Sequence, residues 1–200
     1  MIDKIFYINL DRRADRNQHI LDMFNECNIL PDMYERFSAI EEVNGAMGCT
    51  KSHINILQIA KEINYNYILV IEDDLIINDK TNFINNVNKI FEDNINFDVI
   101  QISGNVLRCT SSEHKYLSKV IDSQTTSGYI VNCKYIDKLI QNYTESLNSM
   151  ILEGKKHENC LDIHWKVLQK TDNWFIFNPK LGYQMDGYSD IEKRITKYGC

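Results

Sequence analysis

The sequence contains few of the residues that interrupt regular structure: only 2 prolines and 8 glycines in 200 residues. This composition excludes a collagen-like chain and a low-complexity linker. There are six cysteines, but no two of them have the CxxC spacing. The sequence therefore predicts neither a zinc ribbon nor a redox motif of the thioredoxin type.

Positive charge is also scarce. The chain has 22 Lys and Arg against 28 Asp and Glu, which gives a formal net charge of −6. Proteins that bind nucleic acid need a basic surface to neutralise phosphates, and this sequence has no long run of basic residues. We therefore expect no nucleic-acid partner.

Long apolar runs are absent as well. The most apolar stretch, Tyr67 to Ile71, ends at Glu72, far short of the roughly 20 residues that span a bilayer. The N-terminal segment reads MIDKIFYINLDRR, so its basic residues follow the apolar stretch and no small-residue cleavage site comes after them. A signal peptide has the opposite order. We expect no transmembrane segment and a cytoplasmic location.

What the sequence does contain is an alternation of strand-like and helix-like patterns, over a length typical of one domain. Strands are predicted at 4–10, 34–40, 67–71, 97–103, 117–121, 128–132 and 174–177. Helices are predicted at 19–27, 50–64, from an N-cap at Thr81 to Phe91, at 134–147 and at 161–169, with loops at 41–48, 104–116 and 153–159 and an irregular tail. This alternation predicts a single α/β domain over residues 1–200, with a mostly parallel sheet flanked by helices. In such folds, ligands bind beyond the carboxyl ends of the strands.

The most distinctive local feature is Glu72-Asp73-Asp74, directly after the strand at 67–71. Three adjacent carboxylates repel one another unless a cation neutralises them. Hard divalent cations such as Mg²⁺ and Mn²⁺ prefer oxygen ligands and commonly bridge carboxylates to substrate phosphates. The alternative is a solvated acidic turn, because acids are common at turns.

Other polar segments stand at positions where a ligand site is expected. The stretch Asn9 to Arg16 follows the first strand, and its arginines suit a phosphorylated ligand; the alternative is a charged helix start. The stretch Gly48 to His53 opens a helix, whose free N–H groups suit an anion; the alternative is an ordinary helix N-terminus. A zinc site made by His157, Cys160 and His164 lacks an evident fourth ligand and is not expected.

The segments INLDRRADR, GAMGCTKSH, YILVIEDDL, SGYIV, CLDIHW, NPKLGYQ and SDI occur in this order over about residues 2 to 191. Together they resemble glycosyltransferase family 25, which includes lipooligosaccharide galactosyltransferases and collagen hydroxylysine galactosyltransferases. The resemblance implies a GT-A-type, Rossmann-like fold, a UDP-sugar donor and transfer with inversion at the anomeric carbon. The chain is shorter than is usual in the family on the acceptor side, so the acceptor is the least determined part of this interpretation.

The resemblance also implies roles for particular residues in the acidic segment. Glu72-Asp73-Asp74 corresponds to the family's variant of the metal-binding DxD motif. Asp74 is then the most direct ligand of Mn²⁺ or Mg²⁺, and Glu72 assists directly or through water. Asp73 is expected near the ribose or the sugar.

Further roles follow for the donor and the general base. The resemblance places Ser52 and His53 near the donor's sugar or pyrophosphate, and makes Asp162 the candidate general base, with Asp186 and Asp190 as alternatives. Tail residues 183–189 are candidates for a lid over the donor, or for a passive surface tail. The uridine pocket is expected to be lined by Asn9, Leu10, Asp11, Arg12 and Arg13.

The sequence thus predicts a metal-dependent transferase that moves a hexose, galactose or glucose, from a UDP-sugar to a hydroxyl of an acceptor. That acceptor is a glycan, a lipid-linked saccharide or a hydroxylysine-type group. One alternative is a non-catalytic nucleotide-sugar binding or scaffold protein with the same fold. A receiver-type phosphoryl-transfer domain is a further alternative, but it would place an acid pair after the first strand, where this chain has Asp11-Arg12-Arg13.

Overall fold

The computed structural model describes residues 1–154, 157–191 and 193–197. Residues 155 and 156 of the predicted loop at 153–159, and the last cysteine, Cys200, lie outside these ranges. Eight strands form one sheet in the order β2-β1-β3-β8-β5-β9-β7-β6. Their bounds are β1 Lys4–Asn9, β2 Tyr34–Ser38, β3 Tyr67–Glu72, β5 Val99–Gln101, β6 Asn105–Ser111, β7 Leu117–Gln124, β8 Gly128–Asn132 and β9 Trp174–Phe177.

The sheet is mixed. Strands β2, β1 and β3 pair in parallel, as do β5 and β9, whereas β8 and β7 run antiparallel to their neighbours. Most strands therefore point the same way, and the carboxyl ends of β1, β2 and β3 meet at one edge. The predicted α/β fold with a mixed, mostly parallel sheet in one domain is confirmed.

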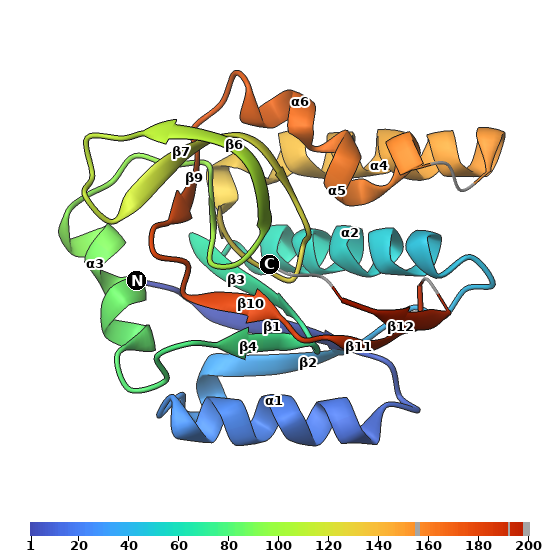
Figure 1. The fold of residues 1–200 in the computed structure, drawn as a ribbon, viewed down its shortest axis with the longest axis horizontal. Coiled ribbons are helices and arrows are strands. Elements are labelled where there is room, and N and C mark those ends of the chain that lie inside the picture. The colour runs from blue at the N-terminus through green and yellow to red at the C-terminus, as the bar shows by residue number, and fades with distance from the viewer. Residues whose placement is uncertain (155–156, 192, 198–200) are drawn as a thin grey trace.

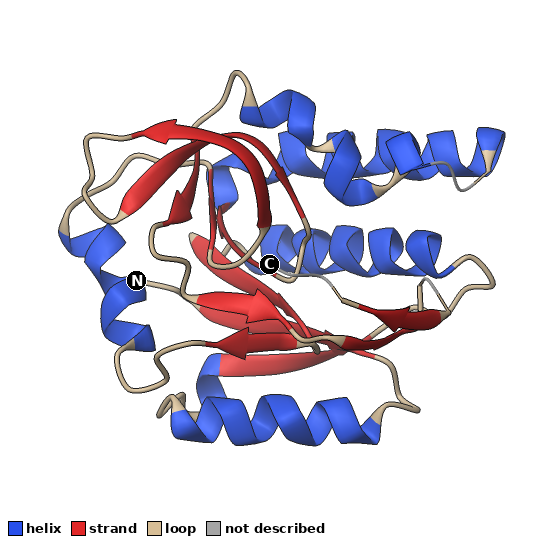
Figure 2. Ribbon diagram, in the orientation of Figure 1, coloured by secondary structure: helices blue, strands red, loops and turns tan. Residues whose placement is uncertain are grey.

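Helices cover both faces of this sheet, as Figures 1 and 2 show. Helices α1 (Ala14–Glu26) and α3 (Phe83–Glu92) pack on one face, and α2 (Gly45–Ile63) and α4 (Ile136–Glu153) on the other, joined there by the short helices α5 (Leu161–His164) and α6 (Lys166–Gln169). The alternation of side chains along β1 explains the two layers: Ile5 and Tyr7 enter the first core, and Phe6 and Ile8 the second. No helix in the described ranges is long and apolar enough to cross a membrane.

Two short antiparallel ladders complete the fold. Strand β10 (Gly182–Gln184) pairs with β4 (Leu75–Ile77), and β11 (Gly187–Ser189) pairs with β12 (Arg194–Thr196). A Cβ on Gly182 would lie 2.6 Å from the carbonyl oxygen of Ile76, so glycine permits the close approach of β10 to β4. The C-terminal tail, which is predicted as irregular, thus pairs through β10 with the strand that directly follows the acidic segment.

Several predicted boundaries are wrong. Helix α2 begins at Gly45, inside the predicted loop 41–48, because the side chain of Asn44 accepts a hydrogen bond from Ala46 N (3.2 Å) and caps the helix. The N-cap of α3 is Asn82 rather than Thr81. The predicted loop 104–116 contains β6, and the predicted helix 161–169 is divided into α5 and α6.

Candidate functional site

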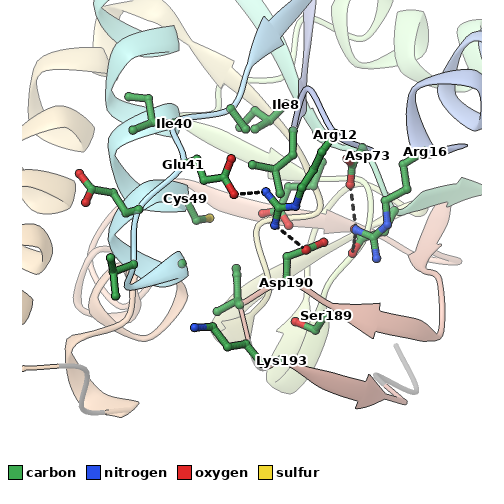
Figure 3. Close-up of a pocket in the computed structure, with 18 of the residues that line it drawn as sticks. Ile8, Arg12, Arg16, Ile40, Glu41, Cys49, Asp73, Ser189, Asp190 and Lys193 are labelled. Carbon is green, nitrogen blue, oxygen red and sulfur yellow. Dashed lines mark hydrogen bonds and ion pairs between the residues drawn. The ribbon is translucent and has the colours of Figure 1, made fainter. Parts of the chain in front are cut away.

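A cleft of about 650 Å³ opens beyond the carboxyl ends of β1, β2 and β3, the place predicted for a ligand (Figure 3). One side is formed by the N-terminal half of the chain and the opposite side by the segment that follows β10. The lining residues are Ile8, Leu10, Arg12, Arg16, Ala39, Ile40, Glu41, Glu42, Val43, Gly45, Cys49, Glu72, Asp73, Asp74, Gln184, Ser189, Asp190, Ile191 and Lys193.

The acidic floor of the cleft consists of Glu72, Asp73 and Asp74. Asp73 has both carboxylate oxygens occupied: Asn9 Nδ2 donates to Oδ2 at 2.7 Å and a guanidinium nitrogen of Arg16 donates to Oδ1 at 2.9 Å. Burial raises the pKa of Asp73, while the charge of Arg16 opposes the rise. Asp73 is therefore a fixed part of the protein framework as well as a lining residue.

Asp74 is held differently. Its Oδ2 accepts hydrogen bonds from Gln184 Nε2 at 3.1 Å and from Arg16 at 3.4 Å. Its Oδ1 is buried and has no hydrogen-bond partner among the described residues. Burial, followed by the negative charge of Glu72, raises the pKa of Asp74 to about 7. An orphaned carboxylate oxygen in this environment is suited to a cation.

Glu72 is oriented by a buried network. Thr126 Oγ1 donates to Glu72 Oε1, and His53 Nε2 lies 3.3 Å from the same oxygen. On its other side, His53 Nδ1 lies 2.8 Å from the Tyr129 hydroxyl. Burial opposes the ionisation of Glu72, but the interactions with His53, Thr126 and Arg16 together lower the pKa of Glu72. Helix α2 and strand β8 thereby fix the direction of this carboxylate.

Arg16 is the arginine that contacts the acidic floor. It lies in the first turn of α1, is 8% exposed, and reaches Asp73, Asp74 and the carbonyl oxygen of Tyr188 (2.8 Å). The sequence predicts donor binding by Arg12 and Arg13 of this stretch and assigns no separate role to Arg16. No local pattern distinguishes Arg16 from Arg12 and Arg13, because its side-chain partners lie 57 or more residues away along the chain.

Arg12 and Arg13 both form ion pairs with Asp190, which lies on the far side of the cleft. Arg12 pairs with Glu41 and, at 2.7 Å, with Asp190, and Arg13 pairs with Asp190 at 2.7 Å and with Asp15 at 2.8 Å. Figure 3 shows Arg12 between Glu41 and Asp190 across the mouth of the cleft. Arg12 lines the cleft, whereas Arg13 does not.

Four other predicted donor residues do not line the cleft. Asn9, which is 1% exposed, holds Asp73, and Asp11 pairs with Arg36 at 2.7 Å. Ser52 Oγ accepts from Ile40 N (2.9 Å) and so fixes a segment that lines the cleft. His53, 0% exposed, acts on Glu72 as described above. None of these four residues lines the interior of the cleft, whereas Leu10 does.

Asp162 is also set back from the cleft. Its Oδ2 accepts a hydrogen bond from Thr125 N at 3.0 Å, and the adjacent residue, Thr126, binds Glu72. Burial raises the pKa of Asp162, and the charge of Glu72 adds to the rise. Asp162 and the acidic floor are therefore neighbours across the turn that joins β7 to β8. Of the alternative bases, Asp190 lines the cleft but is engaged by two arginines.

Two donor sets for a metal ion are present at the cleft. Among the described residues, one group of His, Cys, Asp and Glu brings three candidate ligand atoms within 4.8 Å of one another: Cys49, His53 and Glu72. This mixed set has the chemistry of a softer metal such as zinc. Glu72 and the orphaned oxygen of Asp74 would supply oxygen ligands to Mg²⁺ or Mn²⁺, so the residues present fit a hard cation as well. The residues His157, Cys160 and His164, for which no zinc site is expected, form no such group within the described ranges.

Comparison with known proteins gives the family. The model of glycosyltransferase family 25, described as an LPS biosynthesis protein, matches residues 43–153, more than half of the chain. The chain belongs to glycosyltransferase family 25. A search of curated proteins gives no significant match.

Solved structures share the fold at low sequence identity. A glycosyltransferase involved in glycosylation of the major capsid of PBCV-1 has 12% identity and a TM-score of 0.53, covering 96% of this chain and 97% of that chain. A protein titled mannose-1-phosphate geranyltransferase, from Thermus thermophilus, has 8% identity and a TM-score of 0.53, covering 91% and 73%. A197 from STIV has 10% identity and a TM-score of 0.50, covering 99% and 100%. The fold is of the GT-A type.

Proposed function

We propose that this chain transfers a hexose, galactose or glucose, from a UDP-sugar to a hydroxyl group of an acceptor, with a divalent cation and with inversion at the anomeric carbon. The observation that carries the proposal is the cleft, which combines three adjacent carboxylates with arginines at the ligand-binding edge of a GT-A-type sheet. Family membership supports a transferase.

The charge of the cleft supports the need for a cation. Its lining contains six acids, Glu41, Glu42, Glu72, Asp73, Asp74 and Asp190, and three bases, Arg12, Arg16 and Lys193. With all of them ionised, the formal sum is −3, and a nucleoside diphosphate would add further negative charge. A divalent cation held by the acidic floor would reduce this repulsion.

One part of the cleft lining is apolar and suits a nucleoside. Ile8, Leu10, Ala39 and Ile40 provide apolar surface beside β1 and β2. A planar base can lie against such surface, while the diphosphate extends toward the charged end. We therefore propose that uridine occupies this apolar end and that Arg12 contacts the phosphates through charge-assisted hydrogen bonds.

In the proposed reaction, the acceptor hydroxyl oxygen forms a bond to the anomeric carbon as the bond from that carbon to the diphosphate oxygen breaks. Asp162 accepts the hydroxyl proton, and UDP leaves with the electron pair of the broken bond. Glu72 and Asp74 would hold the cation, which when bound would stabilise charge on the leaving diphosphate. The buried position of Asp162 raises its pKa and thereby makes it a stronger base.

The proposed acceptor is defined by its chemical class, which is a glycan, a lipid-linked saccharide or a hydroxylysine-type hydroxyl. The second candidate function is binding of a nucleotide sugar without catalysis. One observation favours it: the guanidinium of Arg16 already contacts Asp73 and Asp74 and so partly neutralises the acidic floor.

A nucleotide-sugar screen tests the proposal. Purified protein is incubated with UDP-galactose, UDP-glucose, UDP-N-acetylhexosamines and matched GDP-sugars, with Mn²⁺, with Mg²⁺ or with a chelator. Thermal shift and release of the free nucleotide are measured. We expect stabilisation and slow UDP release from one UDP-hexose, only with the metal. Metal-dependent stabilisation without any nucleotide release, even with saccharide acceptors present, would favour the binding function. If the screen shows neither stabilisation nor nucleotide release, both functions are contradicted.

A further inference from the structure

Gln184 lines the acidic end of the cleft, and its side chain has an unsatisfied atom. The residue is only 6% exposed. Its Oε1 is buried and has no hydrogen-bond partner among the described residues. A buried amide oxygen without a partner costs free energy unless something else satisfies it.

The orientation of this amide is set by its neighbour. Gln184 Nε2 donates to Asp74 Oδ2 at 3.1 Å. The opposite orientation would place the amide oxygen against a carboxylate that has no proton to donate when ionised. The N–H group therefore faces Asp74, and the amide oxygen remains available beside it.

The fold brings these two side chains together from distant parts of the chain. Strand β4 begins directly after Asp74, and the β10–β4 ladder places Gln184 opposite Leu75. Met185 N also donates to the carbonyl oxygen of Asp74 at 2.7 Å. The position of Gln184 is thus fixed by backbone hydrogen bonds on both sides of it.

Two buried oxygens without partners, Asp74 Oδ1 and Gln184 Oε1, therefore stand on adjacent side chains at the acidic end of the cleft. We propose that Gln184 is a ligand of the cation, and that its side-chain oxygen completes an oxygen site with Asp74 and Glu72. A neutral amide oxygen suits Mn²⁺ or Mg²⁺ and adds no negative charge to a cleft that already has an excess of acids. This inference rests on the metal dependence in the proposed function.

The test compares Gln184→Met, which keeps the shape and removes the ligand oxygen, with Gln184→Glu, which keeps an oxygen and removes the N–H donor. Mn²⁺ affinity in the presence of UDP is measured by electron paramagnetic resonance of the free ion. The number of water molecules on bound Mn²⁺ is counted by electron spin echo modulation in D₂O. Asn142→Leu is the matched control, because Asn142 is also a buried amide with an unpartnered oxygen but lies on α4, outside the cleft lining.

We expect Gln184→Met to weaken Mn²⁺ binding by about tenfold or more and to add one water molecule to the bound ion. Gln184→Glu should keep the water count of the wild type, and Asn142→Leu should change neither quantity. Equal water counts in Gln184→Met and Gln184→Glu, or an unchanged Mn²⁺ affinity in Gln184→Met, would overturn the proposal. If Gln184→Met does not fold, the Gln184→Glu water count decides: one water more than the wild type overturns the proposal.

The outcomes separate this proposal from the proposed function. A wild-type protein that binds Mn²⁺ and releases UDP from a UDP-sugar, while Gln184→Met binds Mn²⁺ normally, contradicts the role of Gln184 alone. A wild-type protein that binds Mn²⁺ through Gln184 but releases no UDP contradicts the transferase alone. A wild-type protein that binds no Mn²⁺ with UDP present contradicts both.

Discussion

The acidic floor and the opposite wall of the cleft are held in place in different ways. The floor follows β3, which is hydrogen-bonded to β1 on one side and to β8 on the other, and whose residues Ile68 to Ile71 are fully buried. The C-terminal wall, formed by Gln184, Ser189, Asp190, Ile191 and Lys193, depends on two three-residue ladders and on ion pairs from Arg12 and Arg13.

This difference indicates that packing in the hydrophobic core fixes the position of the floor, whereas ion pairs at the cleft fix the position of the wall. A buried central strand cannot shift without loss of many apolar contacts. Partly exposed ion pairs contribute much less, about 0.2–1 kcal/mol each. Because Arg12 is also the expected partner of the donor's phosphates, donor binding and the position of the wall should be coupled.

The largest effect is expected from the floor. Asp74→Asn removes the charge beside the orphaned oxygen, and should reduce Mn²⁺-dependent UDP binding by about 100-fold or more, as expected when a charge-assisted interaction in a water-poor site is lost. Asp73→Asn is the informative comparison, because both of its oxygens are already occupied by Asn9 and Arg16, and it should lose less Mn²⁺ affinity. Calorimetry measures both, and equal losses would contradict the distinction between the two carboxylates.

The next largest effect is expected from Asp162. Asp162→Asn should lower kcat roughly 10²–10⁴-fold, the usual contribution of a general base, with little change in UDP-sugar binding. Asp98→Asn is the matched control, since Asp98 also accepts a hydrogen bond from a backbone N–H, that of Asn173 (2.8 Å), but directly precedes β5 and so lies at the sheet edge opposite the cleft. Transfer within about threefold of the wild type would place the base elsewhere, with Asp186 and Asp190 tested next.

The role of Asp162 as general base also predicts that the transfer rate depends on pH. The base acts only when ionised, and burial and Glu72 raise the pKa of Asp162. The opposing charge on this carboxyl comes from His157, and Thr125 N stabilises the ionised form. The transfer rate should therefore fall as the pH decreases through a value above the ordinary pKa of an aspartate. A rate that stays constant through the range above about pH 4 would contradict this assignment.

A smaller effect is expected from the arginines that connect the floor to the wall. Arg12→Ala with Arg13→Ala should raise the KM for the donor about tenfold, because a charge-assisted hydrogen bond contributes roughly 1.5–3 kcal/mol. Arg108→Ala removes an exposed charge on β6, outside the cleft lining, and should leave the KM unchanged. Normal donor kinetics in the double variant would show that these arginines serve only the wall and the start of α1.

The smallest effect is expected from the wall itself. Asp190→Asn removes the ion pair between Arg12 and the wall, and so makes the guanidinium of Arg12 more available to phosphate. UDP affinity should rise, by no more than about fivefold for an ion pair of this exposure. Calorimetry is compared with Asp186→Asn, whose carboxylate is outside the cleft lining. A fall in affinity would show that the wall must be held closed before UDP binds.

The sequence predicted the central strands well because their signal is local. The strand at 67–71 and its neighbours are buried on both faces and form continuous apolar runs. Strand β6 was missed because it lies at the edge of the sheet and most of its residues are exposed, so that no apolar pattern marks it. Strand β10 was missed because three residues are too few to show a period.

The residues of the candidate site also divide into those that the sequence reveals and those that it does not. The carboxylates after β3 and the arginines after β1 could be found because strand ends are where ligands bind in such folds. The contributions of Cys49, Arg16 and Gln184 were missed, since each depends on a contact with a segment at least 23 residues away along the chain. Ser52 and His53 were placed near the donor, but their side chains point behind the wall, because the buried face of α2 includes both.

The sequence by itself therefore determined the alternation of strands and helices, the order of the family's motifs and the presence of three carboxylates at the end of a buried strand. These are properties of neighbouring residues, which share one backbone direction and one pattern of burial. Only the tertiary structure decided which carboxylate keeps a free oxygen. That outcome depends on Asn9, Arg16 and Gln184, which arrive from three other segments and occupy three of the four oxygens of Asp73 and Asp74.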